Sequence, residues 1–222
     1  MKGYGQFCSF ARALDLLGER WTLLVVRELL CGSRRFGEVR RGIPRISRTM
    51  LSARLRQLVD AGVIERVDDG TAYALTPAGL ELAGAVRELG TWGQRWLPRS
   101  LPPEELDVDT LLWDMRRRIR RERLPRTSVV VRIELTDVRG RAGEWFLLLR
   151  RSEVSLCDHN PGFAEELHVR GSLRTLTAWW RGDVSLAEAR AAGMVVDGRR
   201  PWVRAFPAWF ERYLFAEVAP AA

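Results

Sequence analysis

The sequence predicts an α+β protein with two domains, the first mostly helical and the second combining strands with helices. Three observations support this prediction. Apolar residues recur at a helical period through most of residues 7–97, whereas apolar runs after residue 128 indicate strands. The segment 98–106 contains three prolines, which favours a linker. We therefore expect domains at 1–97 and 107–222.

Local signals divide the first domain into helices and one β-hairpin. We predict helices over residues 6–17, 20–31, 34–43, 47–61 and 77–97, with Gly18 ending the first, Ser47 capping the fourth and Pro77 opening the fifth. The Asp-Gly pair at 69–70 predicts a tight turn between two short strands. This order of elements is typical of a winged helix-turn-helix domain, with the hairpin as the wing.

The helix predicted at 47–61 combines an apolar stripe with a polar face. On a helical wheel, Leu51, Leu55 and Leu58 share one side, while Thr49 and Arg56 lie opposite. Hydrogen-bonding side chains near a helix N-terminus, beside a small residue, suit base edges in the major groove. The leucine stripe is expected to anchor the helix to the core.

The other residues of this helix receive different roles. Ser52 flanks the outer face and is a second candidate for a base contact, and Ser47 lies at its N-terminal edge. Arg45 and Arg48 lie near the positive end of the helix dipole and suit phosphates. Arg54 lies beside the apolar stripe, where it would support the fold. A solvated surface helix without a ligand is the alternative interpretation.

Positive charge gathers around this helix. The formal net charge is +8, and residues 31–60 contain eight arginines against two acidic residues. Arg34 and Arg35 are expected to touch phosphates rather than bases, and Thr71 in the predicted wing is a further candidate contact. Asp68 and Asp69 at the wing tip oppose this interpretation, because carboxylates would meet phosphates poorly. An anionic partner, double-stranded DNA, is the favoured prediction.

Several segments of the first domain resemble one known family. These are the Gly18-x-x-Trp21 step, "RRFGEV", the "IS" before the predicted reading helix, "LSARLRQL" and the closing "Y-x-LTPAG". Over about ninety residues the sequence is similar to the HxlR-type branch of the MarR-like winged helix-turn-helix regulators. The resemblance implies a homodimeric transcriptional regulator whose first and last helices of this domain form the dimer contact. That contact would include Phe7, Phe10, Leu14, Leu89, Trp92 and Trp96.

The same resemblance draws attention to Cys8. Members usually carry a cysteine near the start of the first helix, and some sense oxidants or electrophiles through it. In many members a proline follows, whereas Ser9 follows here. Cys8 is therefore a candidate redox residue, with a small apolar packing residue as the alternative.

The second domain shows the order helix, strands, helices, strand, helix, and the final helix is predicted over 199–215. The stretch "EELHVRGSLRTLTAWWRGDVSLAEARAAGMVVDG" resembles the sterol-carrier-protein-2-like (SCP2-like) fold, a curved sheet with helices over one face. That fold implies a gap for an apolar ligand. Plain core packing of the aromatic residues is the alternative. We expect Trp179 and Trp180, as helix neighbours, not to be buried together. The candidate pocket residues are Trp113, Phe146, Trp179, Trp180 and Trp209.

Other function classes find little support. Three widely spaced cysteines predict neither a disulfide framework nor a zinc site, and we expect no metal and no cofactor. Phosphate-binding, dinucleotide-binding, zinc-protease and serine-hydrolase motifs are missing, so no catalytic residues and no enzyme activity are expected. No leader or membrane-spanning segment is recognised, which predicts a soluble cytoplasmic protein without a membrane partner.

The sequence thus predicts a dimeric, repressor-like transcriptional regulator that binds a palindromic double-stranded DNA operator. A small apolar effector bound by the second domain would modulate it. Two alternatives stay open. The protein could carry a lipid or small molecule without regulatory DNA binding, or it could be a redox-sensing regulator acting through Cys8.

Overall fold

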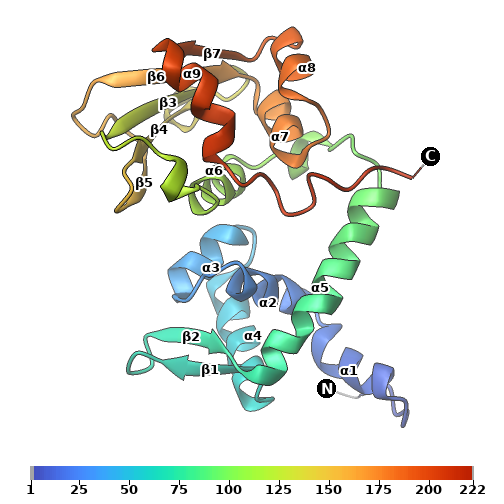
Figure 1. The fold of residues 1–222 in the computed structure, drawn as a ribbon. Helices are drawn as coiled ribbons and strands as arrows, with labels where there is room; N and C mark the ends of the chain where they lie inside the picture. The colour runs from blue at the N-terminus through green and yellow to red at the C-terminus, as the bar shows by residue number, and fades with distance from the viewer. Residues whose placement is uncertain (1–2, 222) are drawn as a thin grey trace. The chain divides into compact units, whose positions relative to one another are not determined.

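A computed structural model describes residues 3–221 of the chain (Figure 1). The chain divides into two compact units, Met1–Gly93 and Gln94–Ala222. None of the helices within residues 3–221 has both the length and the apolar character needed to cross a bilayer.

The first unit is built from helices and one hairpin, as predicted. Its elements are α1 (Ser9–Leu17), α2 (Thr22–Leu30), α3 (Phe36–Gly42), α4 (Arg48–Asp60), β1 (Ile64–Val67), β2 (Ala72–Leu75) and α5 (Pro77–Trp96), of which α5 continues into the second unit. The core lies among α2, α3, α4 and the hairpin. Leu51, Leu55 and Leu58 of α4 are each at most 1% exposed, which confirms the apolar stripe predicted for this helix.

The hairpin has the turn that its sequence predicts. β1 and β2 pair antiparallel from Ile64 opposite Leu75 to Val67 opposite Ala72. Between them Asp68, Asp69 and Gly70 adopt positive φ angles, as tight hairpin turns require.

A short third segment joins this hairpin. Arg35 forms an isolated antiparallel bridge with Ala72, and the Tyr73 N–H donates a hydrogen bond of 2.8 Å to the Arg34 carbonyl. The residues that lead into α3 are therefore fixed to β2.

The second unit contains a five-stranded mixed sheet. Its strands are β3 (Val129–Leu135), β4 (Glu144–Leu149), β5 (Val154–Cys157), β6 (Glu165–Gly171) and β7 (Val195–Gly198). Their order across the sheet is β5-β4-β3-β6-β7, and only the central β3–β6 pair is parallel.

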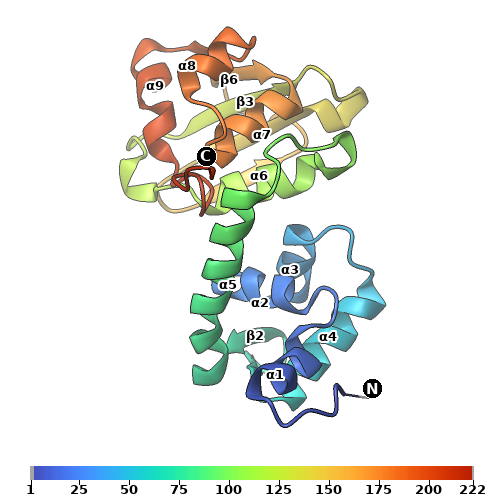
Figure 2. The same ribbon diagram turned by 90° about the vertical axis from the view of Figure 1, so that its right-hand side faces the viewer.

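Helices cover one face of this sheet (Figure 2). They are α6 (Val108–Arg117), α7 (Leu173–Arg181), α8 (Leu186–Ala191) and α9 (Arg200–Ala205). The unit also contains short 3-10 helices at Pro103–Glu105, Arg121–Arg123, Gly140–Gly143 and Phe206–Trp209. Alternate strand residues such as Val131, Ile133 and Leu147 point into the layer between sheet and helices and are fully buried.

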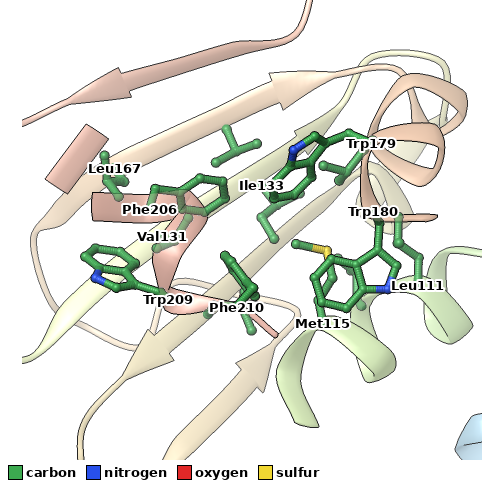
Figure 3. Packing of buried hydrophobic residues seen from close by; sticks show 14 of the residues in the cluster. Leu111, Met115, Val131, Ile133, Leu167, Trp179, Trp180, Phe206, Trp209 and Phe210 are labelled. Carbon is green, nitrogen blue, oxygen red and sulfur yellow. The ribbon is translucent and has the colours of Figure 1, made fainter. Parts of the chain in front are cut away.

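Aromatic rings fill the middle of this layer (Figure 3). Trp179 stacks on Phe206 with ring centroids 5.9 Å apart, and the Phe210 ring is nearly perpendicular to the rings of both Trp179 and Trp180. The prediction that Trp179 and Trp180 are not buried together is wrong, because each is 2% exposed. Both tryptophans are buried because each has its own partner. Trp179 packs against Phe206, and the Trp180 indole N–H donates a hydrogen bond to Asp114 of α6.

The final aromatic helix is shorter than predicted. α9 ends at Ala205, a 3-10 turn follows, and Phe210 is extended and bridges to Ile119. Pro207 lacks the N–H that an α-helix would direct to the carbonyl four residues earlier, so the helix cannot continue regularly through it.

The division between the units also lies earlier than the expected linker. It falls inside α5, between Gly93 and Gln94, because Gln94 is 5% exposed and bonds within the second unit. Its side-chain amide donates to Asp183 at 3.2 Å and accepts from Arg181 at 3.2 Å. The proline-containing segment 98–106 therefore belongs to the second unit.

Candidate nucleic-acid interface

The start of α4 is fixed by Ser47. Its Oγ accepts a hydrogen bond of 3.1 Å from the Met50 N–H, which confirms the predicted cap. Arg48 and Thr49 follow in the first turn and are exposed, and no acidic residue lies in that turn. The positive end of the helix dipole is thus free of nearby carboxylates on α4 itself.

The outer side of α4 presents the residues expected to contact bases. Thr49 and Arg56 are exposed and Ser52 is half-buried, whereas the leucines behind them are in the core. Arg45 is exposed immediately before the helix. The α4 face, which we define as Arg45, Ser47, Arg48, Thr49, Ser52 and Arg56, therefore combines hydroxyls and guanidinium groups on α4 and on the residues that lead into it.

Arg54 does not belong to this face. Its guanidinium donates to the Arg20 carbonyl at 3.1 Å and forms a salt bridge of 2.7 Å with Glu19. It also donates to the Gln57 side chain at 2.8 Å. These bonds tie α4 to the segment between α1 and α2, which confirms the supporting role predicted for Arg54.

Arg34 and Arg35 precede α3 and are exposed. The Glu38 carboxylate accepts hydrogen bonds from both of their backbone N–H groups, at 2.8 and 3.0 Å. The Arg34 guanidinium also lies 3.5 Å from the Asp68 carboxylate at the wing tip. Part of the acidic charge that opposed DNA binding in the sequence is therefore paired with an arginine.

The wing supplies Thr71 and one residue that the sequence reasoning missed. Thr71 is exposed, and its hydroxyl donates to the Asp68 carbonyl at 2.7 Å, so it holds the turn. Arg66 on β1 is exposed and its guanidinium lies 5.6 Å from the centre of the Tyr73 ring. Strand alternation could not have identified it, because Arg66 lies two residues after the buried Ile64 and therefore on the same face of β1.

Comparison with known proteins shows which family this part of the chain resembles. A model of the HxlR-like helix-turn-helix family matches residues 16–101. The HTH-type transcriptional regulator YvaP of Bacillus subtilis, itself uncharacterized, is 36% identical over 96 residues, which cover 41% of this chain and 89% of YvaP. The chain belongs to the HxlR-like helix-turn-helix family.

Other relatives align with the same HxlR-like part. An uncharacterized HTH-type transcriptional regulator of Mycobacterium tuberculosis is 46% identical over 100 residues, which span 43% of this chain and 63% of the relative. The crystal structure of quinone-bound YodB from Bacillus subtilis is 35% identical, with 39% of this chain and 97% of that chain covered and a TM-score of 0.36. YvaP, the mycobacterial relative and YodB are all named as transcriptional regulators and not as enzymes.

In this HxlR-like chain Cys8 is exposed and lies at the N-cap of α1. The backbone N–H groups of Ala11 and Phe10 lower the pKa of its thiol below the ordinary value. A lowered pKa increases the fraction of thiolate at neutral pH, and the thiolate is the form that reacts with oxidants and electrophiles.

Exposed apolar residues are frequent on α1 and α5 and just before α1. Phe7 is 99% exposed and Phe10 72%, while Leu14 is half-buried. On α5, Leu89, Trp92 and Trp96 are exposed by 56%, 56% and 60%. These are large apolar side chains that the fold of this chain leaves exposed to solvent.

The residues proposed to line a pocket do not all lie together. Trp179, Trp180 and Trp209 share the aromatic core of the second unit (Figure 3). Phe146 lies on the opposite face of the sheet, in a small cluster with Val130 and Leu148, so its assignment to the same pocket is wrong. Adjacent strand residues face opposite sides, and β4 directs Leu147 rather than Phe146 toward the helices. Trp113 is 6% exposed beneath the Arg116 guanidinium.

Proposed function

We propose that the protein is a transcriptional regulator that binds double-stranded DNA through the α4 face and the wing. The α4 face carries this proposal, because it places hydroxyl and guanidinium groups at a capped, acid-free helix N-terminus above a rigid leucine core. Thr49, Ser52 and Arg56 would meet base edges, while Arg34, Arg35, Arg45 and Arg48 would meet phosphates. Membership in the HxlR-like family and relatives named as transcriptional regulators support it. With chromosomal DNA as its partner, the protein would act in the cytoplasm.

The test is a gel-shift titration with DNA from upstream of the protein's own coding sequence. Arg56→Ala and Thr49→Ala should each weaken operator binding by about 5- to 150-fold, and binding to random DNA much less. Arg35→Ala should weaken both about equally and flatten the salt dependence by roughly one unit. Unchanged operator affinity in Arg56→Ala would show that the α4 face does not read the sequence.

Dimerisation through α1 and α5 is the second part of the proposal. The side chains of Phe7, Phe10, Leu14, Leu89, Trp92 and Trp96 would be covered by the same residues of a second copy, giving two reading helices related by a two-fold axis. A palindromic operator with half-sites about one helical turn or more apart would follow. Sedimentation equilibrium should give a dimer that Trp92→Arg dissociates, whereas Trp92→Arg with an unchanged mass would exclude this surface.

The second unit is proposed to sense a small apolar effector within an SCP2-like arrangement and thereby to relieve repression. The support is its single sheet with helices over one face and the aromatic layer that Trp179, Trp180 and Trp209 build between them. Apolar ligands that insert there should quench tryptophan fluorescence and raise the melting temperature. A broad panel of apolar metabolites that changes neither quantity would leave this layer with a purely structural role.

Redox sensing through Cys8 is a second candidate function. The exposed thiol and the lowering of its pKa by the α1 N-terminus favour it. Oxidant should release the wild-type protein from DNA, while Cys8→Ser should stay bound. Equal release of both proteins would assign the oxidant response to another residue.

A further inference from the structure

The second unit carries a basic surface that the proposed function does not use. It is formed by residues 120–128, which follow α6, and by the turn 150–153 between β4 and β5. We define the arginine patch as Arg120, Arg121, Arg123, Arg126, Arg150 and Arg151. Five of the six arginines are exposed and Arg150 is half-buried.

Hydrogen bonds hold the two segments of the patch side by side. The Arg121 guanidinium donates to the Ser152 carbonyl at 3.1 Å, and Arg151 donates to the Leu124 carbonyl at 2.7 Å. Arg150 donates to the Ser128 hydroxyl at 3.1 Å. Arg121 from one segment and Arg150 and Arg151 from the other therefore reach across, so the two arginine-rich segments lie against each other.

This surface is also attached firmly to the core. Leu124 is 1% exposed within the main hydrophobic cluster, and Ile119 bridges to Phe210. The Arg120 N–H donates to the Trp209 carbonyl at 2.7 Å. The arginines thus project from an ordered segment and not from a solvated tail, which lowers the entropic cost of binding a partner.

The charge of the patch is not compensated by carboxylates. Within residues 3–221, no salt bridge joins any of the six arginines to an acidic side chain, and the side chains of Arg121, Arg150 and Arg151 donate to carbonyl and hydroxyl oxygens instead. Elsewhere in the unit, Arg132, Arg170 and Arg181 are paired with Glu144, Glu134 and Asp183 respectively.

The charge balance of the sequence leads to the same conclusion. Residues 94–222 contain 22 arginines and 18 acidic residues. The two segments of the patch hold six of these arginines and two glutamates, so the rest of the unit has 16 of each sign. The whole positive excess of the second unit is therefore in the arginine patch.

We propose that the arginine patch binds backbone phosphates of double-stranded DNA without reading its sequence. Arginine forms paired hydrogen bonds with phosphate, and guanidinium groups held by carbonyl oxygens keep their full charge for an anion. The inference rests on the proposed function, since DNA held by the first unit is present at high effective concentration for the second unit of the same chain. The patch adds affinity and salt dependence, while the α4 face determines sequence preference.

The test compares two triple variants of the full chain. Arg120→Gln/Arg123→Gln/Arg126→Gln removes three exposed patch charges whose side chains make none of the hydrogen bonds described above. Arg190→Gln/Arg200→Gln/Arg204→Gln removes three exposed charges from α8 and α9. Both variants have the same net charge, so a difference between them reports on the position of the charges and not on their number.

Binding to a random duplex is followed by fluorescence anisotropy over a series of salt concentrations. The patch variant should bind at least about tenfold more weakly at low salt and flatten the slope of log affinity against log salt by about two to three units. The α8–α9 variant should change the slope by less than about half a unit. Equal slopes for the two variants would overturn the proposal, provided that both melt within about 2 °C of the wild type.

Two further arms separate the possible outcomes. Vesicles containing phosphatidylserine test an anionic membrane surface, and patch-dependent binding to vesicles with unchanged DNA binding would overturn the assignment to DNA. Arg56→Ala on operator DNA tests the α4 face alone. If Arg56→Ala loses operator binding while the patch variant matches its control, the inference fails and the proposed function stands. If Arg56→Ala keeps operator binding while the patch variant binds more weakly than its control, the second unit binds DNA and the reading-face assignment fails.

Discussion

The indole N–H of Trp180 donates a hydrogen bond of 2.8 Å to Oδ2 of Asp114, and this bond joins α7 to α6 in the interior of the second unit. The other carboxylate oxygen accepts from Arg117 at 2.7 Å and from Arg118 at 3.1 Å. Burial by itself raises the pKa of Asp114, but Arg117, Arg118 and the indole N–H outweigh burial and lower it.

Asp114→Asn should therefore destabilise the second unit. It removes the buried negative charge between two arginines, and the expected loss is about 2–4 kcal/mol in the free energy of unfolding. Urea denaturation followed by tryptophan fluorescence measures this loss. Glu217→Gln, an exposed control, should change the free energy by less than about 0.5 kcal/mol. An equally small effect of Asp114→Asn would mean that the carboxylate is not needed to bring α6 and α7 together.

The same carboxylate predicts a pH dependence. Because the pKa of Asp114 is lower in the folded than in the unfolded protein, the charged group stabilises the fold above its unfolded pKa of about 3.9. This contribution is lost as the pH falls from that value through the folded pKa. Wild-type stability should therefore decrease across this acid range more steeply than that of Asp114→Asn, and parallel curves would contradict the assignment.

Arg54 and Arg56 lie two residues apart on α4, yet we expect the loss of Arg54 to reduce stability and the loss of Arg56 to reduce DNA binding. Arg54→Ala breaks the bonds to Glu19 and the Arg20 carbonyl and should cost about 1–2 kcal/mol in stability. Arg56→Ala should leave stability within about 0.5 kcal/mol and weaken operator binding. Thermal unfolding and gel shifts on the same two samples separate these effects. Loss of operator binding in a fully stable Arg54→Ala protein would place Arg54 on the reading face instead.

Ser47 is expected to act mainly through its cap. Ser47→Ala removes the acceptor for the Met50 N–H and should cost about 1 kcal/mol. Ser47→Asp restores a capping oxygen, so its stability should return to near the wild-type value, while its negative charge should repel DNA phosphates. Chemical denaturation and DNA titration of both variants test this division. Normal DNA binding by a stable Ser47→Asp protein would show that phosphates do not approach this end of α4.

Gly42 allows α3 to approach a buried carboxylate of α2. A Cβ at Gly42 would overlap the side chain of Glu28, which is fully buried and is held by Arg27 at 2.7 Å. Gly42→Ala should therefore cost about 1–3 kcal/mol or more. Gly37→Ala on the same helix is the matched control, because a Cβ there meets nothing within 4 Å and should stabilise by a few tenths of a kcal/mol. Similar effects of the two substitutions in denaturation experiments would exclude this steric account.

Local features could be predicted from the sequence, because neighbouring residues determine them. Ser47 as a cap, Pro77 at the start of α5 and the positive φ angles after β1 depend on contacts within a few residues. The same holds for the stripe of leucines on α4, which follows the helical period. The end of α9 is also determined locally, because Pro207 lies two residues after its last residue and prevents a longer regular helix.

Features that depend on distant segments could not be predicted in the same way. Burial of Trp180 required its indole to contact Asp114 and Phe210, which lie 66 residues before it and 30 residues after it. The side of the sheet that Phe146 faces depends on strand register, and a shift by one residue reverses it. For this reason the polar face of α4 was identified from the sequence, whereas the proposed pocket was assembled from residues on both faces of a sheet.

The parallel pairing of β3 with β6 has a consequence for synthesis on the ribosome. The first unit consists of helices and a hairpin that close over short stretches, so it can fold as soon as it emerges. β3 is the first strand of the second unit to emerge and it pairs with β4, but its other edge stays open until residues 165–171 have been made. A nascent chain stalled within this interval would expose an apolar strand edge from the middle of the future sheet, and that species is the one that chaperones should bind.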